Sequence, residues 1–329
     1  MAGLKSVSPR ARGWARIGAG IIVVAAIVAT VGAGPFIRGL TSVSAVPVVV
    51  AVLLTGIATA SAAWRWRVVA AGLGLELSWR GAIAAYYRSQ FLNAVLPGGV
   101  VGDIHRAYRH GRRSGDVALA ARAVVTERIA GQLVQCALTL VVLAALGLAS
   151  PLHGLAWVIG GVAVLLVIAT AIVATAAGGR RFLRRELRML HQLFRDPGRS
   201  VQIVASSIVV VTSHTTVFVV ACLATGVHAS LTEMVALALI ALSAAALPVN
   251  VGGWGPREGA AASAFAIVGL GAGAGVAAST AFGVLATIAL LPGAAVLLVD
   301  RIQVARTRRP PSIATEEPIT ERLIEEVNA

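Results

Sequence analysis

Long stretches without charged residues are the feature that most limits how this chain can fold. A helix needs about 20 apolar residues to cross a bilayer. The stretches lack the alternating pattern of an outer-membrane strand, and irregular backbone would leave its polar groups unpaired in lipid. The sequence therefore predicts an all-α integral membrane protein. The stretches free of Asp, Glu, Lys and Arg include 17–37, 39–64, 129–179, 200–232, 234–256 and 259–299.

The amino-acid composition supports membrane residence and argues against a nucleic-acid partner. Of the 329 residues, 57% are hydrophobic and 13% are charged, whereas soluble domains carry about 25% charged residues. The net charge of +14 indicates Arg-rich cytoplasmic loops beside an anionic leaflet, because no basic soluble domain is seen that would bind nucleic acid. Cys136 and Cys222 lie in apolar stretches. We therefore expect no disulfide framework, no metal site and no cofactor.

Arginines and lysines in short loops set the expected orientation, because such loops stay on the cytoplasmic side. The basic tail at 1–16 and the polar tail at 301–329 are both predicted to be cytoplasmic, and the latter to be disordered. A single transmembrane domain then covers 17–300, with a short outer loop at Arg38–Ser44. Its predicted spans, about six, are 17–37, 46–70, 124–148, 155–177, 201–223 and 275–299.

A basic amphipathic helix is predicted at 178–200, between two halves of the domain at about 17–150 and 155–300. Arginines there interleave with apolar residues at helical spacing, a pattern typical of helices that lie on a membrane surface. Anchoring to anionic lipids is the simpler interpretation. Docking of a soluble cytoplasmic enzyme at 180–199 is the alternative.

Two interrupted segments, Leu96–Asp103 and Leu247–Glu258, share one order of residues. Each has Leu-Pro, then a Gly pair, a further Gly and an acidic residue. The first opens from the inner side and the second from the outer side, which predicts two re-entrant hairpins in an inverted repeat. Two complete spans over 231–270 satisfy the same charge pattern, and simple kinks in a passive bundle are a further interpretation. Paired Gly/Pro breaks in inverted halves are typical of a transport site.

Ionisable residues at membrane depth are costly and therefore mark candidate functional positions. Asp103 and Arg106 stand three residues apart, so we expect them to pair with each other on a helix. Adjacent helical residues diverge by about 100°, so Glu127 and Arg128 should contact different partners. Two interpretations are open for Arg257 and Glu258: they have a functional role, or they form a structural ion pair. Three further arginines are expected in a solvated inner loop: Arg109, Arg112 and Arg113.

Taken together, the motifs resemble the lysylphosphatidylglycerol synthase transmembrane-region family, whose members are also called flippase-like domain proteins. The resemblance covers about 15–300, and it implies a bacterial or archaeal inner-membrane helix bundle with re-entrant segments. In the best-known members this region is thought to flip an aminoacylated phospholipid, ahead of a cytoplasmic aminoacyltransferase domain. Because this chain ends at Ala329, we expect it to be similar to the stand-alone members. The resemblance is carried by Arg88–Asn93, Leu96–Gly99, Gly102–Asp103, Arg106, Thr126–Arg128, Pro248, Gly252–Gly253, Gly255 and Arg257–Glu258.

The residues and the resemblance together lead us to expect a lipid translocator of the bacterial inner membrane rather than an enzyme. An anionic or phosphate-bearing lipid, or a lipid-linked intermediate, would place its head group between the two broken segments. Arg88, Arg106 and Arg257 would contact the phosphate, and nearby carboxylates would hold these arginines or a cationic part of the head group. No catalytic residue is assigned. The expected substrate-binding residues are Arg88, Asn93, Pro97, Gly98, Gly99, Asp103, Arg106, Glu127, Arg128, Gly252, Gly253, Arg257 and Glu258.

Two other functions fit the same features. A membrane enzyme acting on a lipid phosphate, such as a polyprenyl-linked glycosyl transferase, would need an acid and a base that face one cavity. Asp103 and Glu127 resemble such a pair in the sequence, although neither is assigned as catalytic. A non-catalytic partner subunit would instead use the helix at 178–200 to dock a soluble enzyme.

Overall fold

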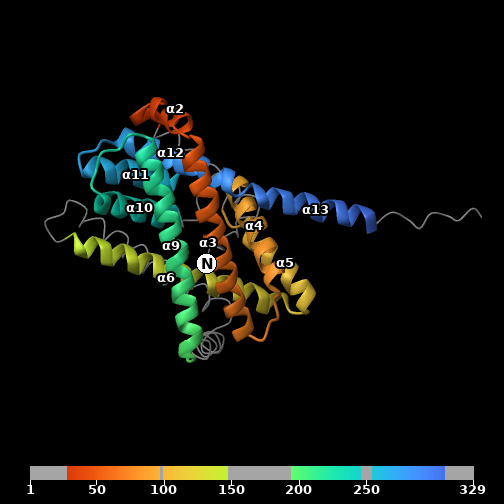
Figure 1. The fold of residues 1–329 in the computed structure, drawn as a ribbon. Helices are drawn as coiled ribbons and strands as arrows, with labels where there is room; N and C mark the ends of the chain where they lie inside the picture. Colours follow the sequence, from red (N-terminus) through yellow and green to blue (C-terminus); the bar gives the residue numbers. More distant parts are fainter. Residues whose placement is uncertain (1–27, 97–98, 147–193, 246–253, 308–329) are drawn as a thin grey trace, which may run out of the picture.

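The computed structural model describes residues 28–96, 99–146, 194–245 and 254–307, and these residues form helices joined by turns, with no sheet (Figure 1). Four helical runs in this part of the chain are long and apolar enough to cross a membrane: α3, α6, α9 and the run Ala272–Gln303 that joins α12 to α13. The helices are α2 (Gly34–Thr41), α3 (Ala45–Gly72), α4 (Trp79–Val95), α5 (Val101–Ser114), α6 (Val117–Ala145), α9 (Pro197–Ala224), α10 (Leu231–Ala245), α11 (Pro256–Ile267), α12 (Ala272–Ala289) and α13 (Leu291–Thr307).

The spans predicted at 46–70, 124–148 and 201–223 correspond to α3, α6 and α9. The helix α6 begins earlier than predicted because the side chain of Asp116 accepts a hydrogen bond from the amide of Leu119 at 2.8 Å and caps it. The span predicted at 275–299 corresponds to α12 and α13, which separate at Leu290. The predicted span at 155–177, most of the helix at 178–200 and the tail at 1–16 lie outside the described residues. The tail predicted to be disordered from 301 is helical at its start, because α13 continues to Thr307, and its remainder at 308–329 lies outside the described residues.

The prediction of a loop at Arg38–Ser44 is wrong, because α2 occupies most of these residues. The preceding helical residues end before Gly32, whose φ of +84° breaks the predicted first span. Pro35 then stands in the first turn of α2, where its missing N–H costs nothing. Gly39 holds α2 close to α12, since a Cβ there would lie 2.5 Å from the carbonyl oxygen of Ala277. Packing on α12 therefore turns an expected loop into a helix.

The centre of the molecule is the pair α3 and α9, which lie side by side along most of their length (Figure 1). The main hydrophobic core joins α9 to α10, α11 and α12, and it is built from small residues around Phe218, Phe265 and Phe282. Small residues let helices approach closely where lipid removes the usual hydrophobic driving force. Large apolar side chains such as Leu53, on α3, and Val141, on α6, remain exposed on the outside, as a lipid-facing surface requires.

Both interrupted segments separate two packed helices. The helices α4 and α5 flank the first, and α10 and α11 flank the second. Each pair also packs on the helix that follows it, α6 or α12. At 15 residues, α10 is shorter than a full span. The helix–break–helix pattern predicted from the Leu-Pro and Gly residues is thus present between the end of α4 at Val95 and the start of α5 at Val101. Residues 97–98 and 246–253, within the two breaks, lie outside the described residues.

Candidate functional site

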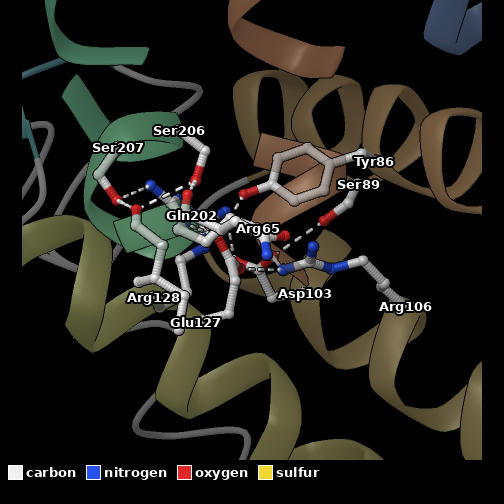
Figure 2. A network of polar contacts seen from close by, with 11 residues as sticks. Arg65, Tyr86, Ser89, Asp103, Arg106, Glu127, Arg128, Gln202, Ser206 and Ser207 are labelled. Carbon is white, nitrogen blue, oxygen red and sulfur yellow. Dashed lines mark hydrogen bonds and ion pairs between the residues drawn. The ribbon is translucent and has the colours of Figure 1, made fainter. Parts of the chain in front are cut away.

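A buried carboxylate, Glu127 of α6, is contacted by side chains from three other helices (Figure 2). Its Oε1 accepts hydrogen bonds from Arg65 of α3, at 2.9 Å from Nε and 2.5 Å from Nη2. The hydroxyl of Tyr86, on α4, donates to the same oxygen at 2.9 Å, and Arg106 Nη2 of α5 donates to Oε2 at 3.1 Å. Glu127 itself is 0% exposed. A charge at this depth is tolerable only because it is fully paired.

Asp103 is the second carboxylate of the network, at the third position of α5. It accepts hydrogen bonds from Ser89 Oγ, Asn93 Nδ2 and Arg106 Nη2, each at 3.0 Å. Arg128 Nη2 lies 2.6 Å from Asp103 Oδ2. Burial alone would raise the pKa of Asp103, but the guanidinium groups of Arg128 and Arg106 hold that pKa below its ordinary value. Asp103 is therefore an anion at neutral pH.

Arg106 joins the two carboxylates, so Asp103 and Glu127 belong to one network, which we call the Glu127 cluster. It consists of Arg65, Tyr86, Ser89, Asn93, Asp103, Arg106, Glu127, Arg128 and Ser207. Figure 2 shows side chains from several helices converging on Glu127. The side chain of Arg128 is 47% exposed, whereas those of Arg106 and Glu127 are 0% exposed. The cluster is therefore sealed at Glu127 and open to its surroundings at Arg128.

Arg106 is held between aromatic rings as well as between carboxylates. Its guanidinium carbon lies 4.5 Å from the ring centre of Trp66 and 4.2 Å from that of Tyr86. Such cation–π contacts strengthen where water is excluded. Nε and Nη1 of Arg106 are buried and have no hydrogen-bond partner within the described structure. The ring faces and the cluster carboxylates thus compensate a cation that still has unused donors.

Two glycines allow the cluster to assemble. A Cβ at Gly102 would overlap the carbonyl oxygen of Ser89, and the Gly102 amide donates to Asn93 Oδ1 at 2.7 Å. The start of α5 is thereby pressed against the end of α4. On α6, a Cβ at Gly131 would lie 2.8 Å from the guanidinium of Arg65. Glycine at 102 and 131 therefore determines how closely the charged helices approach.

A second set of charges joins the hairpin α4–α5 to α13. Arg88 of α4 and Arg109 of α5 both contact Asp300 of α13. Arg88 Nη1 is 2.5 Å from Asp300 Oδ2, and Arg109 makes a bidentate pair, with Nη2 at 2.8 Å from Oδ1 and Nη1 on Oδ2. We call this arrangement the Asp300 bridge. Arg88 is therefore engaged by α13, and it takes no part in the contacts that define the Glu127 cluster.

The third set of charges stands at the start of α11. Glu258 Oε2 accepts the Gly255 amide at 2.7 Å, and Oε1 accepts Arg257 Nε at 2.9 Å and Ser279 Oγ at 3.0 Å. The Arg257 guanidinium lies over Phe282 at 5.0 Å. Arg257 and Glu258 thus form the ion pair that the sequence allowed as one interpretation. Pro256 occupies the first turn of α11, where its missing N–H costs nothing.

The two helices that follow the breaks start in the same way. Asp103 is the third residue of α5, and Glu258 is the third residue of α11. Each carboxylate accepts a serine hydroxyl at 3.0 Å, from Ser89 or Ser279, and each pairs with an arginine of its own helix. A carboxylate near a helix N-terminus is also favoured by the helix dipole.

The structure brings five of the predicted site residues into one cluster: Asn93, Asp103, Arg106, Glu127 and Arg128. It confirms that Asp103 pairs with Arg106 and that Glu127 and Arg128 have different partners. Gly99 lies in the turn before α5, with φ +62°, and Arg88 belongs to the Asp300 bridge. The remaining predicted glycines and proline lie outside the described residues: Pro97, Gly98, Gly252 and Gly253.

Sequence reasoning missed Arg65, Tyr86 and Asp300. Arg65 stands beside Trp64 and Arg67, a combination typical of a membrane interface. The guanidinium of Arg67 lies 5.2 Å from the ring centre of the exposed Trp64, whereas Arg65 is 5% exposed and faces the cluster. The loop predicted for Arg109, Arg112 and Arg113 is wrong, because all three belong to α5. Arg112 and Arg113 are exposed on this helix, as expected of solvated residues, whereas Arg109 pairs with Asp300. Within the described residues, no group of three or more His, Cys, Asp or Glu side chains is placed to hold a metal ion.

Comparison with known proteins agrees with the motifs. A family model described as the lysylphosphatidylglycerol synthase TM region matches residues 14–293. The match includes the whole Glu127 cluster and the Arg257–Glu258 pair, and it stops before Asp300. No curated protein and no solved structure matches the chain.

Proposed function

Because this chain belongs to the lysylphosphatidylglycerol synthase TM region family, we propose that it translocates an anionic or phosphate-bearing lipid, or a lipid-linked intermediate, across a membrane. The observation that carries the proposal is the excess of positive charge around the first hairpin, α4–α5, to which α3 and α6 also contribute. The Glu127 cluster contains three arginines, Arg65, Arg106 and Arg128, and only two carboxylates. The Asp300 bridge contains two arginines and one carboxylate.

An unbalanced cation at membrane depth is costly and is compensated best by an anion. A lipid phosphate supplies a negative charge and several acceptor oxygens while its tails remain in the bilayer. Arg128 is the exposed end of the Glu127 cluster, and we infer that the phosphate first contacts the protein there. Arg106 and its unused donors then provide the deeper part of the site.

The packing of the helices supports an inverted repeat, in which the half α3–α6 corresponds to the half α9–α12. Exchanging the two halves maps the contact of α3 with α12 onto that of α9 with α6, and the contact of α3 with α4 onto that of α9 with α10. It also relates the acids at the third positions of α5 and α11. Such repeats place a substrate site between two broken segments and let each open to one side.

The re-entrant form of the second hairpin is part of this proposal, as are the bacterial inner membrane and the cytoplasmic termini. A single cysteine at position 250, in a chain with both native cysteines replaced by serine, tests the hairpin. Labelling by an impermeant reagent from the outer side alone is expected. Labelling from the cytoplasmic side alone would contradict the inverted repeat.

The geometry argues against the enzymatic alternative. Asp103 and Glu127 both accept hydrogen bonds from arginines, so each carboxylate is stabilised as an anion. A general acid needs a raised pKa, and a general base needs access to the reacting proton. Glu127 is 0% exposed and has no such access. Two carboxylates held in this way are suited to positioning arginines.

Reconstitution in liposomes tests the proposal. Purified protein is incorporated with a fluorescent phosphatidylglycerol, and an impermeant quencher reports how fast labelled head groups reach the outer leaflet. We expect Arg128→Gln to slow this exchange severalfold, because it removes the exposed cation of the site. Arg112→Gln, which neutralises an exposed arginine outside the cluster, is the matched control. Equal rates for the two variants would overturn the assignment.

A further inference from the structure

The Asp300 bridge joins the hairpin α4–α5 to a helix that lies mostly beyond the matched family region. Asp300 is the one acidic residue in the sequence of α13, and it follows a long apolar run. Its carboxylate contacts both Arg88 and Arg109. Its side chain is 21% exposed, and that of Arg109 is 32% exposed. The contact is therefore accessible from its surroundings, unlike Glu127.

The cations of the bridge have more hydrogen-bonding capacity than Asp300 uses. Arg88 is 5% exposed, and its Nε is buried with no hydrogen-bond partner in the described structure. The Nδ1 atom of His105, on the same hairpin, is also buried and unpartnered there. Burial and the nearby charges of Arg88 and Arg109 lower the pKa of His105, so the ring is neutral at pH 7. A carboxylate has two oxygens, whereas a phosphate offers more acceptors for the same donors.

The helix α13 is attached to the hairpin by two kinds of contact. At its start, Gly293 packs on the backbone of Tyr87, where a Cβ would overlap the Tyr87 carbonyl oxygen. Further along, Leu298 and Val299 are exposed, and the helix continues past α4 away from the bundle (Figure 1). The Asp300 bridge is thus a polar attachment of this outer part to the hairpin. Breaking it leaves the hydrophobic core of α9–α12 intact.

We propose that Arg88, Arg109 and His105 form a phosphate site, and that Asp300 occupies it as an internal counter-ion which the phosphate of a ligand displaces. Displacement releases the outer part of α13 from the α4–α5 hairpin. Only one part of the inference, that this phosphate belongs to a lipid, rests on the proposed function. A free phosphate has the same chemistry, so both sources are tested.

The variant Asp300→Asn removes the competing charge and keeps the size of the side chain. Detergent-solubilised protein is titrated with short-chain phosphatidylglycerol, short-chain phosphatidylcholine or inorganic phosphate, and thermal stabilisation reports binding. We expect Asp300→Asn to bind phosphatidylglycerol about tenfold more tightly than the wild type, within the usual range for two coupled ligands. Glu233→Gln, the same change at the exposed start of α10, should leave binding unchanged. Binding by Asp300→Asn that is equal to or weaker than wild type overturns the proposal.

Two further variants separate displacement from a structural role. Arg109→Gln should weaken binding severalfold, and Asp300→Asn with Arg109→Gln should lose the gain of the single change. A lower melting temperature of Asp300→Asn without tighter binding would mean that the bridge is structural, and this result refutes the site. A gain for phosphatidylglycerol and not for inorganic phosphate assigns the site to a lipid head group; a gain for both assigns it to phosphate from either source.

The liposome assay keeps this inference distinct from the proposed function. Tighter anion binding by Asp300→Asn with no lipid exchange by any form of the protein supports the site and refutes translocation. Lipid exchange by the wild type, together with unchanged binding by Asp300→Asn, supports translocation and refutes the site.

Discussion

The substitution Glu127→Gln examines the physical basis of the buried cluster. Glutamine keeps the shape of the side chain and one carbonyl oxygen, and it removes the negative charge that Arg65 and Arg106 share. These two arginines are 5% and 1% exposed, respectively, so water cannot replace the lost carboxylate. Asp103 remains as the one carboxylate of the cluster, opposite three arginines.

The expected loss follows from this geometry. Removing one partner of a buried ion pair costs about 3–5 kcal/mol, because the other partner is left as an uncompensated charge. The Tyr86 hydroxyl can still donate to the amide oxygen, so its hydrogen bond at 2.9 Å is retained in weaker form. We therefore expect the free energy of unfolding to fall by about 3–5 kcal/mol.

Unfolding in mixed micelles, followed by circular dichroism against denaturant, measures this change. Arg112→Gln is the control, since an exposed charge contributes about 0–1 kcal/mol. The double variant Arg65→Met with Glu127→Gln should lose less than the sum of the two single changes, because it removes both members of the pair. A loss below about 1 kcal/mol for Glu127→Gln, or strict additivity in the double variant, would show that Glu127 does not compensate the buried arginines.

Three further outcomes follow from individual contacts. Gly102→Ala should destabilise the fold by about 1–3 kcal/mol through overlap with Ser89, measured by thermal melting, whereas Gly56→Ala, where the nearest neighbour lies 3.4 Å away, should change the melting temperature little. Asp196→Ala removes the side chain that accepts the Gly198 amide at the start of α9 and should cost about 1 kcal/mol, seen as faster hydrogen exchange in the first turn. Arg257→Lys should slow lipid exchange, because a lysine cannot reproduce the paired donors of a guanidinium; a rate equal to wild type would remove Arg257 from the account.

Much of the helical scaffold was predictable because membrane crossing demands long apolar runs. Such runs predict α3 and α9 to within about one turn at their ends, whereas the start of α6 lies about two turns before the predicted span. Helical spacing also predicts that Asp103 meets Arg106 and that Glu127 and Arg128 diverge. These predictions succeed because they depend on local geometry.

The missed features depend on contacts between distant parts of the sequence. Glu127 meets Arg65 across 62 positions, and Arg88 meets Asp300 across 212. No spacing rule connects such residues. The helix α2 was missed for a related reason, because its packing on α12 cannot be read from the residues at 34–41. Charge counting on the hairpin would have indicated that Arg88 needs a partner, although it would not have identified α13 as the source.

The central claim is that the chain carries a phosphate-bearing lipid across a bilayer. Its most direct test is the initial rate at which a labelled head group changes leaflet in liposomes that contain the purified wild-type protein. We expect labelled phosphatidylglycerol to exchange faster than in protein-free liposomes, and to exchange faster than a labelled glycolipid that lacks phosphate. Exchange of phosphatidylglycerol at the protein-free rate, or equal acceleration of both lipids, would contradict it.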